Sequence, residues 1–295
     1  MHGAWTVRSA EITVEGQPGE LVLLYEDFSD ACPGMGRYTI EFRRGGEVLY
    51  TYHTNTHEYP PGSPQSAESV ALTTFSLLAN ALPERPDTFL LHPPEPRVRP
   101  APAEPHDGAL IILGSPRRHG NTAILAGWAA DACAAAGLGT TFVYPDERAI
   151  GHCTACYRCF NTGRCVIEDD MDGVIRAIEA ARLIVVCTPV AAGTVSAALK
   201  DLIDRSLSLA AARALSGQTP VQWGLLCSAG VEDFTCVYRV VHAFFTRLGI
   251  RPLGNVLVPD VDEVTDLRAD PDREKDLRDQ MGALLATMAL PDNKP

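Results

Sequence analysis

The chain has 295 residues, enough for one large or two ordinary domains with their own cores. A small protein held together by disulfides alone is therefore excluded. Hydrophobic residues make up 46% and charged residues 21%, which excludes a largely disordered or collagen-like chain. The net charge of -12, without a local basic patch, argues against nucleic acid or anionic lipid as a partner.

No apolar run approaches the roughly 18 residues that a membrane-spanning helix needs. The longest, at residues 183–187, has the length of a buried strand. The first residues contain no uninterrupted hydrophobic segment of the signal-peptide type. We therefore expect a cytoplasmic protein with no membrane-bound part. Four of the nine cysteines lie within thirteen residues, too close for a disulfide framework, so we expect reduced thiols.

A proline-rich stretch divides the sequence. Residues 92–107 contain six prolines, which remove backbone donors and favour an extended spacer. We interpret residues 93–107 as a linker. It would join a small α+β domain, residues 1–92, to a second domain, residues 108–295.

The first domain begins with stretches typical of short strands, at residues 11–14, 21–25 and 38–42. A hairpin turn is predicted at residues 44–47, because its paired glycines tolerate positive φ. Residues 66–82 have the apolar spacing of one amphipathic helix. His53 and His57 lie in a strand-like or loop region, and we expect surface histidines there rather than metal ligands. The sequence assigns this domain no task.

The second domain alternates strands with helices, a pattern typical of a parallel sheet covered on both faces. Strands are predicted at residues 109–113, 140–144, 183–188, 221–228 and 256–259. Helices are predicted at residues 121–136, 171–181, 196–209, 231–248 and 270–288. We therefore predict an α/β fold for this domain, a flavodoxin-like, doubly wound, five-stranded parallel sheet.

A polar loop, Gly-Ser-Pro-Arg-Arg-His-Gly-Asn-Thr at residues 114–122, follows the first of these strands. Amides at the next helix N-terminus, the hydroxyls of Ser115 and Thr122 and an arginine charge suit a phosphate dianion. The loop lacks the motifs of triphosphatases and of dinucleotide-binding proteins, which favours a monophosphate such as FMN. The alternative is a polar turn in which Asn121 caps the helix. The position at the carboxyl end of a strand favours the ligand site.

Four cysteines, Cys153, Cys156, Cys159 and Cys165, form a Cys-x2-Cys-x2-Cys-x5-Cys motif. Four soft thiolates exclude calcium and magnesium and leave an iron-sulfur cluster or zinc. Zinc sites generally separate two cysteine pairs by a longer stretch, so the spacing favours iron and sulfur. The remaining alternative is that these are simply small buried side chains. The other five cysteines are expected in the core: Cys32, Cys133, Cys187, Cys227 and Cys236.

Residues beside the motif suggest no catalytic group. Arg158 and Arg164 would offset thiolate charge or lie on a solvated surface, and His152 is interpreted as a loop histidine. Asp169 and Asp170 are expected to cap the following helix. No catalytic triad or carboxylate pair is found.

These motifs resemble the iron-sulfur flavoprotein branch of the NAD(P)H-dependent FMN reductase superfamily, over about residues 108–260. The resemblance is carried by the loop at 114–122, by Cys-Val-Ile-Glu-Asp-Asp-Met at 165–171, and by Pro189-Val190 followed by Ser-Ala-Ala-Leu-Lys-Asp-Leu-Ile-Asp-Arg at 196–205. It implies that FMN and a 4Fe-4S cluster are bound, the cluster by the four cysteines. The implied FMN-binding residues are Ser115, Arg117, Asn121 and Thr122 at the phosphate, Pro189, Val190, Ala191, Ala192 and Gly193 at the isoalloxazine edge, and Ser228, Ala229 and Gly230.

The sequence departs from the family at one point. Many relatives have an aromatic residue just after the Pro-Val pair, where this chain has Ala191 and Ala192. This weakens the case for stacking on the flavin there. The substitution opens the pocket or leaves the flavin to be covered by a partner subunit.

A one-electron centre paired with FMN would couple single-electron donors to two-electron acceptors. We therefore expect an FMN-dependent oxidoreductase that passes electrons between a 4Fe-4S cluster and FMN. The donor would be NAD(P)H or a ferredoxin-like protein, and the acceptor a quinone, an oxygen species or another protein. Two alternatives stay open: an NAD(P)H-dependent FMN or quinone reductase without a cluster, and a redox-sensing module that uses flavin and thiols. The resemblance also implies a homodimer or a dimer of dimers.

Overall fold

The computed structural model describes residues 3–90, 106–230, 233–261 and 266–289. The predicted linker therefore lies outside the described residues, except for 106 and 107. Contacts group the chain into two units. Unit 1 comprises Met1–Ala101, Thr154–Val166 and Ser208–Gln218, and unit 2 comprises Pro102–Cys153, Ile167–Leu207 and Thr219–Pro295.

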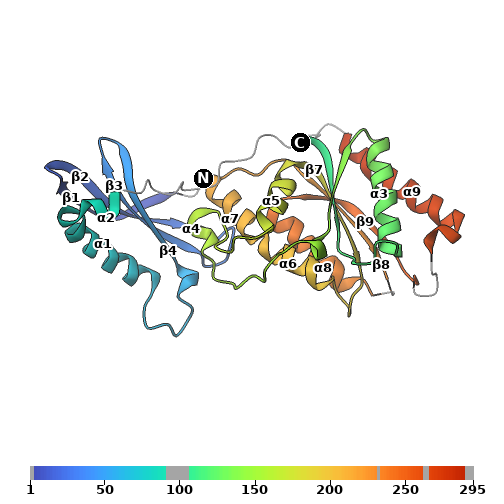
Figure 1. Cartoon of the computed structure of the whole chain (residues 1–295), viewed down its shortest axis with the longest axis horizontal. Helices are drawn as coiled ribbons and strands as arrows, with labels where there is room; N and C mark the ends of the chain where they lie inside the picture. Colours follow the sequence, from blue (N-terminus) through green and yellow to red (C-terminus); the bar gives the residue numbers. More distant parts are fainter. Residues whose placement is uncertain (1–2, 91–105, 231–232, 262–265, 290–295) are drawn as a thin grey trace. The chain divides into compact units, whose positions relative to one another are not determined.

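Unit 1 is built on a four-stranded antiparallel sheet in the order β1-β2-β3-β4 (Figure 1). The strands are β1 (Ala4–Val14), β2 (Gln17–Asp27), β3 (Gly36–Arg44) and β4 (Glu47–Asn55). Three of them contain the predicted strands, and the α+β character of this part is confirmed. The β3–β4 turn is confirmed too, with Gly45 and Gly46 at φ 59° and 86°. Strand β4 was not predicted as such because six of its consecutive residues are half-buried, without the alternation that marks a strand.

The helix α1 covers one face of this sheet. It runs over Ala67–Glu84 and begins at Ser66, whose side chain accepts from the Ser69 amide. Phe75 packs with Ile40 and Phe42 of β3 in the core of the unit. The remaining helical elements of unit 1 are short: η1 (Thr56–Glu58), α2 (Pro86–Leu90), α4 (Cys159–Thr162) and α7 (Leu207–Ser216), which starts at the unit boundary.

Unit 2 contains a five-stranded parallel sheet in the order β6-β5-β7-β8-β9. Numbered within the unit this is 2-1-3-4-5, which is the flavodoxin-like order. The predicted fold class is therefore confirmed. The strands are β5 (His106–Leu113), β6 (Gly139–Val143), β7 (Ala181–Pro189), β8 (Trp223–Ala229) and β9 (Arg251–Val258).

Helices cover both faces of the parallel sheet. In Figure 1, α3 and α9 lie on one side of it and α5, α6 and α8 on the other. Their bounds are α3 (Asn121–Ala135), α5 (Met171–Ala180), α6 (Ala197–Arg205), α8 (Thr235–Leu248) and α9 (Pro271–Ala286), with the 3-10 turns η2 (Pro145–Glu147), η3 (Leu267–Ala269) and η4 (Thr287–Ala289). None of the helices in the described ranges combines the length and apolar character of a membrane span.

Two predictions about unit 2 are wrong in detail. The single helix expected at residues 196–209 is interrupted at Ser206, whose hydroxyl donates to the carbonyl of Ile203 at 2.6 Å. Cys236 is exposed rather than in the core, because it lies on the face of α8 opposite Val237 and Val241. Cys133, Cys187 and Cys227 are buried as expected, whereas Cys32 of unit 1 is only half-buried. Burial raises the pKa of the Cys133 thiol to about 12.

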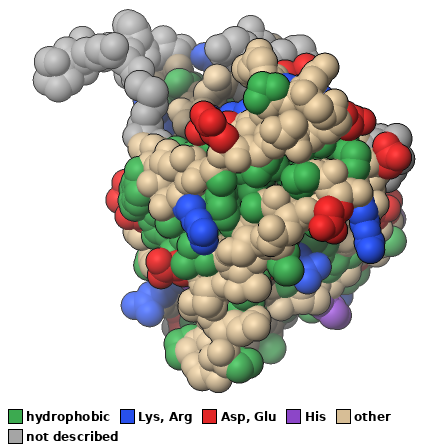
Figure 2. Space-filling model, turned by 90° about the vertical axis from the view of Figure 1, so that its left-hand side faces the viewer, with side chains coloured by type: hydrophobic (Ala, Val, Ile, Leu, Met, Phe, Trp, Pro, Cys, Tyr) green, Lys and Arg blue, Asp and Glu red, His purple; other side chains and the backbone are tan. Residues whose placement is uncertain are grey.

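The surface carries charges of both signs. On the face shown in Figure 2, Lys and Arg side chains lie scattered among Asp and Glu and among hydrophobic side chains. No cluster of a single sign gathers on that face.

Candidate functional site

Three neighbouring strands of unit 2 end at the same edge of the sheet. Leu113 at the end of β5 pairs with Cys187 of β7, and Pro189 at the end of β7 pairs with Ala229 at the end of β8. The ends of these strands and the segments that follow them contain all the predicted FMN-binding residues. The structure therefore brings the predicted segments to one edge, where ligands of such sheets bind.

The loop after β5 is closely packed and leads into a helix that starts without a side-chain cap. Gly114 donates its amide to the Cys187 carbonyl at 2.7 Å, and a Cβ at this position would lie 2.8 Å from Leu199 Cδ2. Ser115 and Thr122 are both 5% exposed. The N-cap of α3 is Gly120, which provides no side-chain cap. The start of α3, where the helix dipole favours an anion, therefore carries no side-chain cap.

Asn121 is not the helix cap that the alternative interpretation required. It is the first residue of α3, and its side chain connects the helix start to residues after β9. Its Oδ1 accepts from the Leu267 amide at 3.0 Å, and its Nδ2 donates to the Val261 carbonyl at 3.4 Å. The Asn121 side chain therefore positions the loop.

The two arginines of the loop differ in their surroundings. Arg118 donates to the Ser115 carbonyl at 2.8 Å, forms ion pairs with Asp146 and Glu147, and lies over the Tyr144 ring. Arg117 is exposed and forms no ion pair within the described part of the chain. The uncompensated positive charge of the loop is therefore that of Arg117.

The segment after β7 turns back on itself. Ala191 and Thr194 exchange two backbone hydrogen bonds, of 2.7 and 3.0 Å. Between them, Ala192 and Gly193 have φ of 46° and 80°, the left-handed values of a type I′ turn. Both are exposed. The place where relatives carry an aromatic residue is thus a tight turn at the surface of unit 2.

The end of β8 and the glycine that follows it are bonded to the neighbouring strands β7 and β9. The buried Ser228 donates its hydroxyl to the Thr188 carbonyl at 2.8 Å, so its side chain joins two strands. Gly230 donates its amide to Val258 at 3.1 Å. A Cβ at Gly230 would lie 2.6 Å from Val190 Cγ2, so only glycine leaves room for that side chain.

The cysteine motif lies on irregular backbone. Ala155 and Tyr157 have φ of 50° and 55°, and Cys159 opens the single turn α4, which Gly163 ends by donating to the Cys159 carbonyl at 2.7 Å. Cys153 belongs to unit 2 and the other three cysteines to unit 1. Within the described residues, no three Cys, His, Asp or Glu side chains lie together as metal ligands. The four thiols suit a soft metal centre, but Cys156, Cys159 and Cys165 of unit 1 do not lie together as ligands in the described structure.

Within unit 1, a polar network ties the cysteine segment, residues 154–166, to the sheet. Asn161 is its centre: Oδ1 accepts from Asn55 Nδ2 at 2.8 Å, Nδ2 donates to Glu58 Oε1 at 2.8 Å, and the carbonyl accepts from Arg37 Nη1 at 2.7 Å. Asn55 also donates to the Tyr157 carbonyl at 3.1 Å. Asn55, Arg37 and Asn161 are 0%, 3% and 8% exposed. The network therefore holds the segment with buried, satisfied groups.

Within unit 2, Arg205 connects the residues that flank the segment on both sides. It is 2% exposed and donates to the carbonyls of Gly151 at 2.8 Å and Ile167 at 3.1 Å. It also forms an ion pair with Asp169 at 2.6 Å. Although burial acts to raise the pKa of Asp169, the hydrogen bonds from Arg205 and from the Gly151 and Met171 amides lower it overall.

The predicted capping of α5 by two aspartates is only partly correct. Asp169 accepts from the Met171 amide at 3.0 Å. Asp170 occupies the N-cap position, but its carboxylate accepts from Ala149 at 2.9 Å instead of from the helix. His152 is exposed, as a loop histidine should be, and its hydrogen bond to Asp201 at 2.7 Å raises its pKa.

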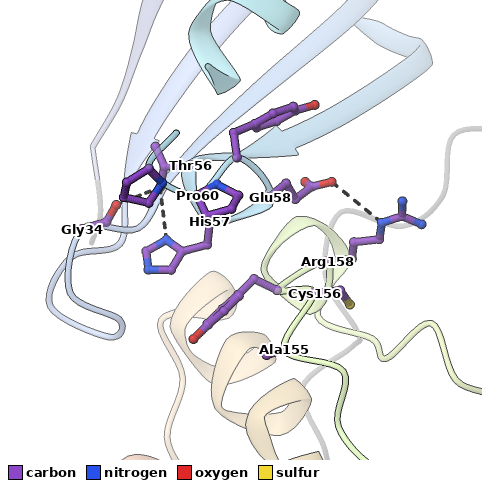
Figure 3. Close-up of a pocket in the computed structure, with 11 residues that line it drawn as sticks. Gly34, Thr56, His57, Glu58, Pro60, Ala155, Cys156 and Arg158 are labelled. Atoms are coloured by element: carbon purple, nitrogen blue, oxygen red, sulfur yellow. Dashed lines mark hydrogen bonds and ion pairs between the residues drawn. The ribbon is translucent and has the colours of Figure 1, made fainter. Parts of the chain in front are cut away.

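A cavity of about 710 Å³ lies beside the cysteine segment in unit 1 (Figure 3). Its walls are η1 with Pro60 and Pro61 on one side and residues 155–158 on the other. His57 lines it and is half-buried. The surface placement predicted for His53 is wrong: this side chain is half-buried in β4, and burial with the nearby Arg37 charge lowers its pKa to about 3. The cavity was not predictable, since its walls lie about one hundred positions apart in the sequence.

Part of this chain is similar in sequence to known proteins. The family model of NADPH-dependent FMN reductase matches residues 109–256. An iron-sulfur flavoprotein of Methanocaldococcus jannaschii is 40% identical over 98 residues, which cover 33% of this chain and 51% of that protein. One of Archaeoglobus fulgidus is 34% identical over 146 residues, which cover 50% of this chain and 66% of that protein. The chain thus matches between half and two thirds of the length of these relatives.

The matched range contains the phosphate loop, the four cysteines and the segments after β7 and β8. The names of the relatives confirm the resemblance to iron-sulfur flavoproteins. Because the family model matches half of the chain, the chain belongs to the NADPH-dependent FMN reductase family.

Proposed function

We propose that the protein is an FMN-dependent oxidoreductase linked to NAD(P)H or to a ferredoxin-like donor. The observation that carries this proposal is the loop after β5. Its buried Ser115 and Thr122 and its uncompensated Arg117 surround the uncapped start of α3, in a chain of an FMN reductase family. Bound FMN would supply the one-electron and two-electron redox chemistry.

The chain's own residues would hold and orient the cofactor. Hydroxyls of Ser115 and Thr122 at the positive end of α3 would bind the phosphate, and Arg117 would neutralise it. The Ser115 Oγ already accepts from the Arg117 amide at 3.3 Å, which leaves its hydroxyl hydrogen for the ligand. The backbone of residues 189–193, with Ala229 and Gly230, would border the ring system.

We further propose that Cys153, Cys156, Cys159 and Cys165 bind a 4Fe-4S cluster. The compact spacing of four thiols and the printed names of the relatives support this. Binding would require the sulfurs to converge from their described positions. A homodimer, with a ferredoxin-like or small-molecule redox partner, is part of the same proposal.

The flavin site is tested by titrating apoprotein with FMN and with riboflavin, which lacks the phosphate. Arg117→Gln is expected to weaken FMN binding about tenfold, because a charge-assisted contact is lost. Riboflavin binding should not change. Equal FMN affinity of the two proteins, or an equal loss for riboflavin, would contradict the proposed role of the loop.

The metal centre is tested by iron and acid-labile sulfide analysis of anaerobically purified protein. Near four irons and four sulfides per chain are expected, with loss on Cys156→Ser and no loss on Cys236→Ser, the exposed cysteine outside the motif. Zinc, or no metal, would overturn the cluster. In that case, sustained NAD(P)H-driven turnover would favour the cluster-free reductase, and reduction without turnover the redox-sensing module.

A further inference from the structure

The cavity of unit 1 has the size and lining of a small-molecule site. Its volume of about 710 Å³ falls within the range of roughly 300–1,000 Å³ that ligand pockets occupy. Its walls combine the rings of His57, Tyr59 and Tyr157 with Pro60 and Pro61. Flat apolar surfaces of this kind favour a planar ligand.

The walls are held in place without a ligand. Asn55 and Glu58 form the capping box of η1, and the same two side chains bond Asn161 of the cysteine segment. Both walls therefore share one buried hydrogen-bond network. Because the walls are already joined by hydrogen bonds, they lose little conformational entropy when a ligand binds in the cavity.

The His57 ring is also fixed. The Thr56 hydroxyl donates to the Gly34 carbonyl at 2.7 Å, so Thr56 Oγ1 must accept from His57 Nδ1 at 3.2 Å. This assigns the Nδ1–H tautomer from the network and leaves Nε2 to accept from the Cys32 thiol at 3.9 Å. The ring lies 4.7 Å from that of Tyr157, with an interplanar angle of 51°.

Arg158 supplies the polar feature of the lining. Its Nε lies 3.8 Å from Glu58 Oε2, longer than a hydrogen bond, and 63% of its side chain is exposed. Glu58 Oε1 is already occupied by Asn55 and Asn161. The guanidinium therefore has donors to spare for an acidic group. Figure 3 shows the Arg158 side chain facing Glu58 at one side of the cavity, with His57 at the other.

We propose that this cavity binds a planar aromatic molecule that carries a carboxylate. The ring system lies against His57 and Tyr157, and the carboxylate pairs with Arg158. Cys156 lines the same cavity, so the ligand lies against the cysteine segment. The N-terminal part of unit 1, which the sequence left without a task, thereby provides one wall of a binding site through η1 and the two prolines that follow it.

The test is calorimetric titration of the FMN-loaded full chain with 2-naphthoate and with its neutral isostere 2-naphthamide. Loading with FMN keeps the probe out of the flavin site. Arg158→Gln is expected to weaken 2-naphthoate binding about tenfold and to leave 2-naphthamide unchanged. Tyr157→Leu should weaken both. Arg164→Gln, an exposed arginine of the same segment outside the lining, is the matched control and should change neither.

Absence of 2-naphthoate binding at millimolar concentration would overturn the proposal, and so would unchanged affinity in Arg158→Gln. An equal loss in Arg164→Gln would show a general charge effect and would also overturn it. Thermal unfolding of each variant establishes that it is folded. FMN and iron content are measured on the same preparations, so a failure of the proposed function is recorded separately from a failure of this site.

Discussion

Asn55 Nδ2 and Asn161 Oδ1 lie 2.8 Å apart, although 106 positions separate the two residues in the sequence. This bond joins the end of β4 to the segment that carries three of the four motif cysteines. Both side chains are buried, so their hydrogen bonds cannot be replaced by water without opening the structure. The N-terminal sheet thus positions the cysteine segment.

Replacing Asn161 with alanine should loosen the cysteine segment. The change removes one hydrogen bond from Asn55 and one from Glu58, at about 0.5–1.5 kcal/mol for each bond lost. A loss of only about 1.4 kcal/mol in the opening free energy raises the open population tenfold. Limited trypsin digestion, read by mass spectrometry, should therefore cleave after Arg158 and Arg164 at least several-fold faster. Asn80→Ala on α1, outside the network, is the control and should leave the cleavage rate unchanged. An unchanged rate in Asn161→Ala would contradict the positioning role.

His53 should make unit 1 less stable at mildly acidic pH. Burial and the Arg37 charge lower its pKa to about 3 in the folded state, against 6.5 when exposed. The unfolded chain therefore binds a proton between these values and the folded chain does not, so stability falls as the pH falls below 6.5 and is unaffected above it. The slope is at most about 1.4 kcal/mol per pH unit.

The measurement is urea unfolding of wild type and His53→Gln at pH 7.5 and 4.5. Carboxylates titrate in both proteins, so the difference between them isolates the histidine. Wild type should lose about 2 kcal/mol more than the variant over this range. Equal losses of unfolding free energy in wild type and His53→Gln would show that the fold does not hold His53 in its neutral form.

The parallel sheet was predictable because its strands are buried on both faces. Residues 183–187 are entirely apolar, and all five are fully buried in β7. The ligand edge followed from the same pattern, since loops after parallel strands share one edge. The antiparallel strand β4 escaped detection because its half-buried residues do not alternate.

Polar partners across the chain were not predictable. Nothing near Arg205 in the sequence indicates that it bonds Gly151, 54 positions away, and Asp169, 36 positions away. Its helix was expected to continue to residue 209 but is interrupted at Ser206, whose hydroxyl donates to the Ile203 carbonyl. Tertiary packing decides these hydrogen-bond partners and this helix end. Hydrophobic periodicity in the sequence indicates only which face of an element is buried.

Gly230→Ala should disturb the flavin edge. The added Cβ would lie 2.6 Å from Val190 Cγ2 and 3.2 Å from the Val190 amide nitrogen, so the segment after β7 must shift. Overpacking of this kind costs about 1–3 kcal/mol, and FMN affinity should fall because residues 189–193 move. Gly127→Ala is the matched control: nothing lies within 4 Å of its Cβ, and alanine in a helix gains about 0.5–1 kcal/mol. Urea unfolding and FMN titration of both variants check this. Equal behaviour of the two would disprove the close contact.

Asp169→Asn should destabilise unit 2 and free the flanks of the cysteine segment. The Arg205 side chain is 1% exposed, and removal of its carboxylate partner leaves a buried charge uncompensated. The expected cost is about 3 kcal/mol in urea unfolding at pH 7.

Because the pKa of Asp169 is lowered in the folded state, the ionised carboxylate stabilises the fold above pH 3.8 and that contribution disappears as the pH falls below it. The stability difference between wild type and variant should therefore shrink toward pH 3. Asp201→Asn removes the exposed pair with His152 and should change stability little. If Asp169→Asn and Asp201→Asn lost the same small unfolding free energy, the burial of Arg205 would not depend on Asp169. Residues 151 and 167 would then be connected only by the hydrogen bonds that Arg205 donates to their carbonyls.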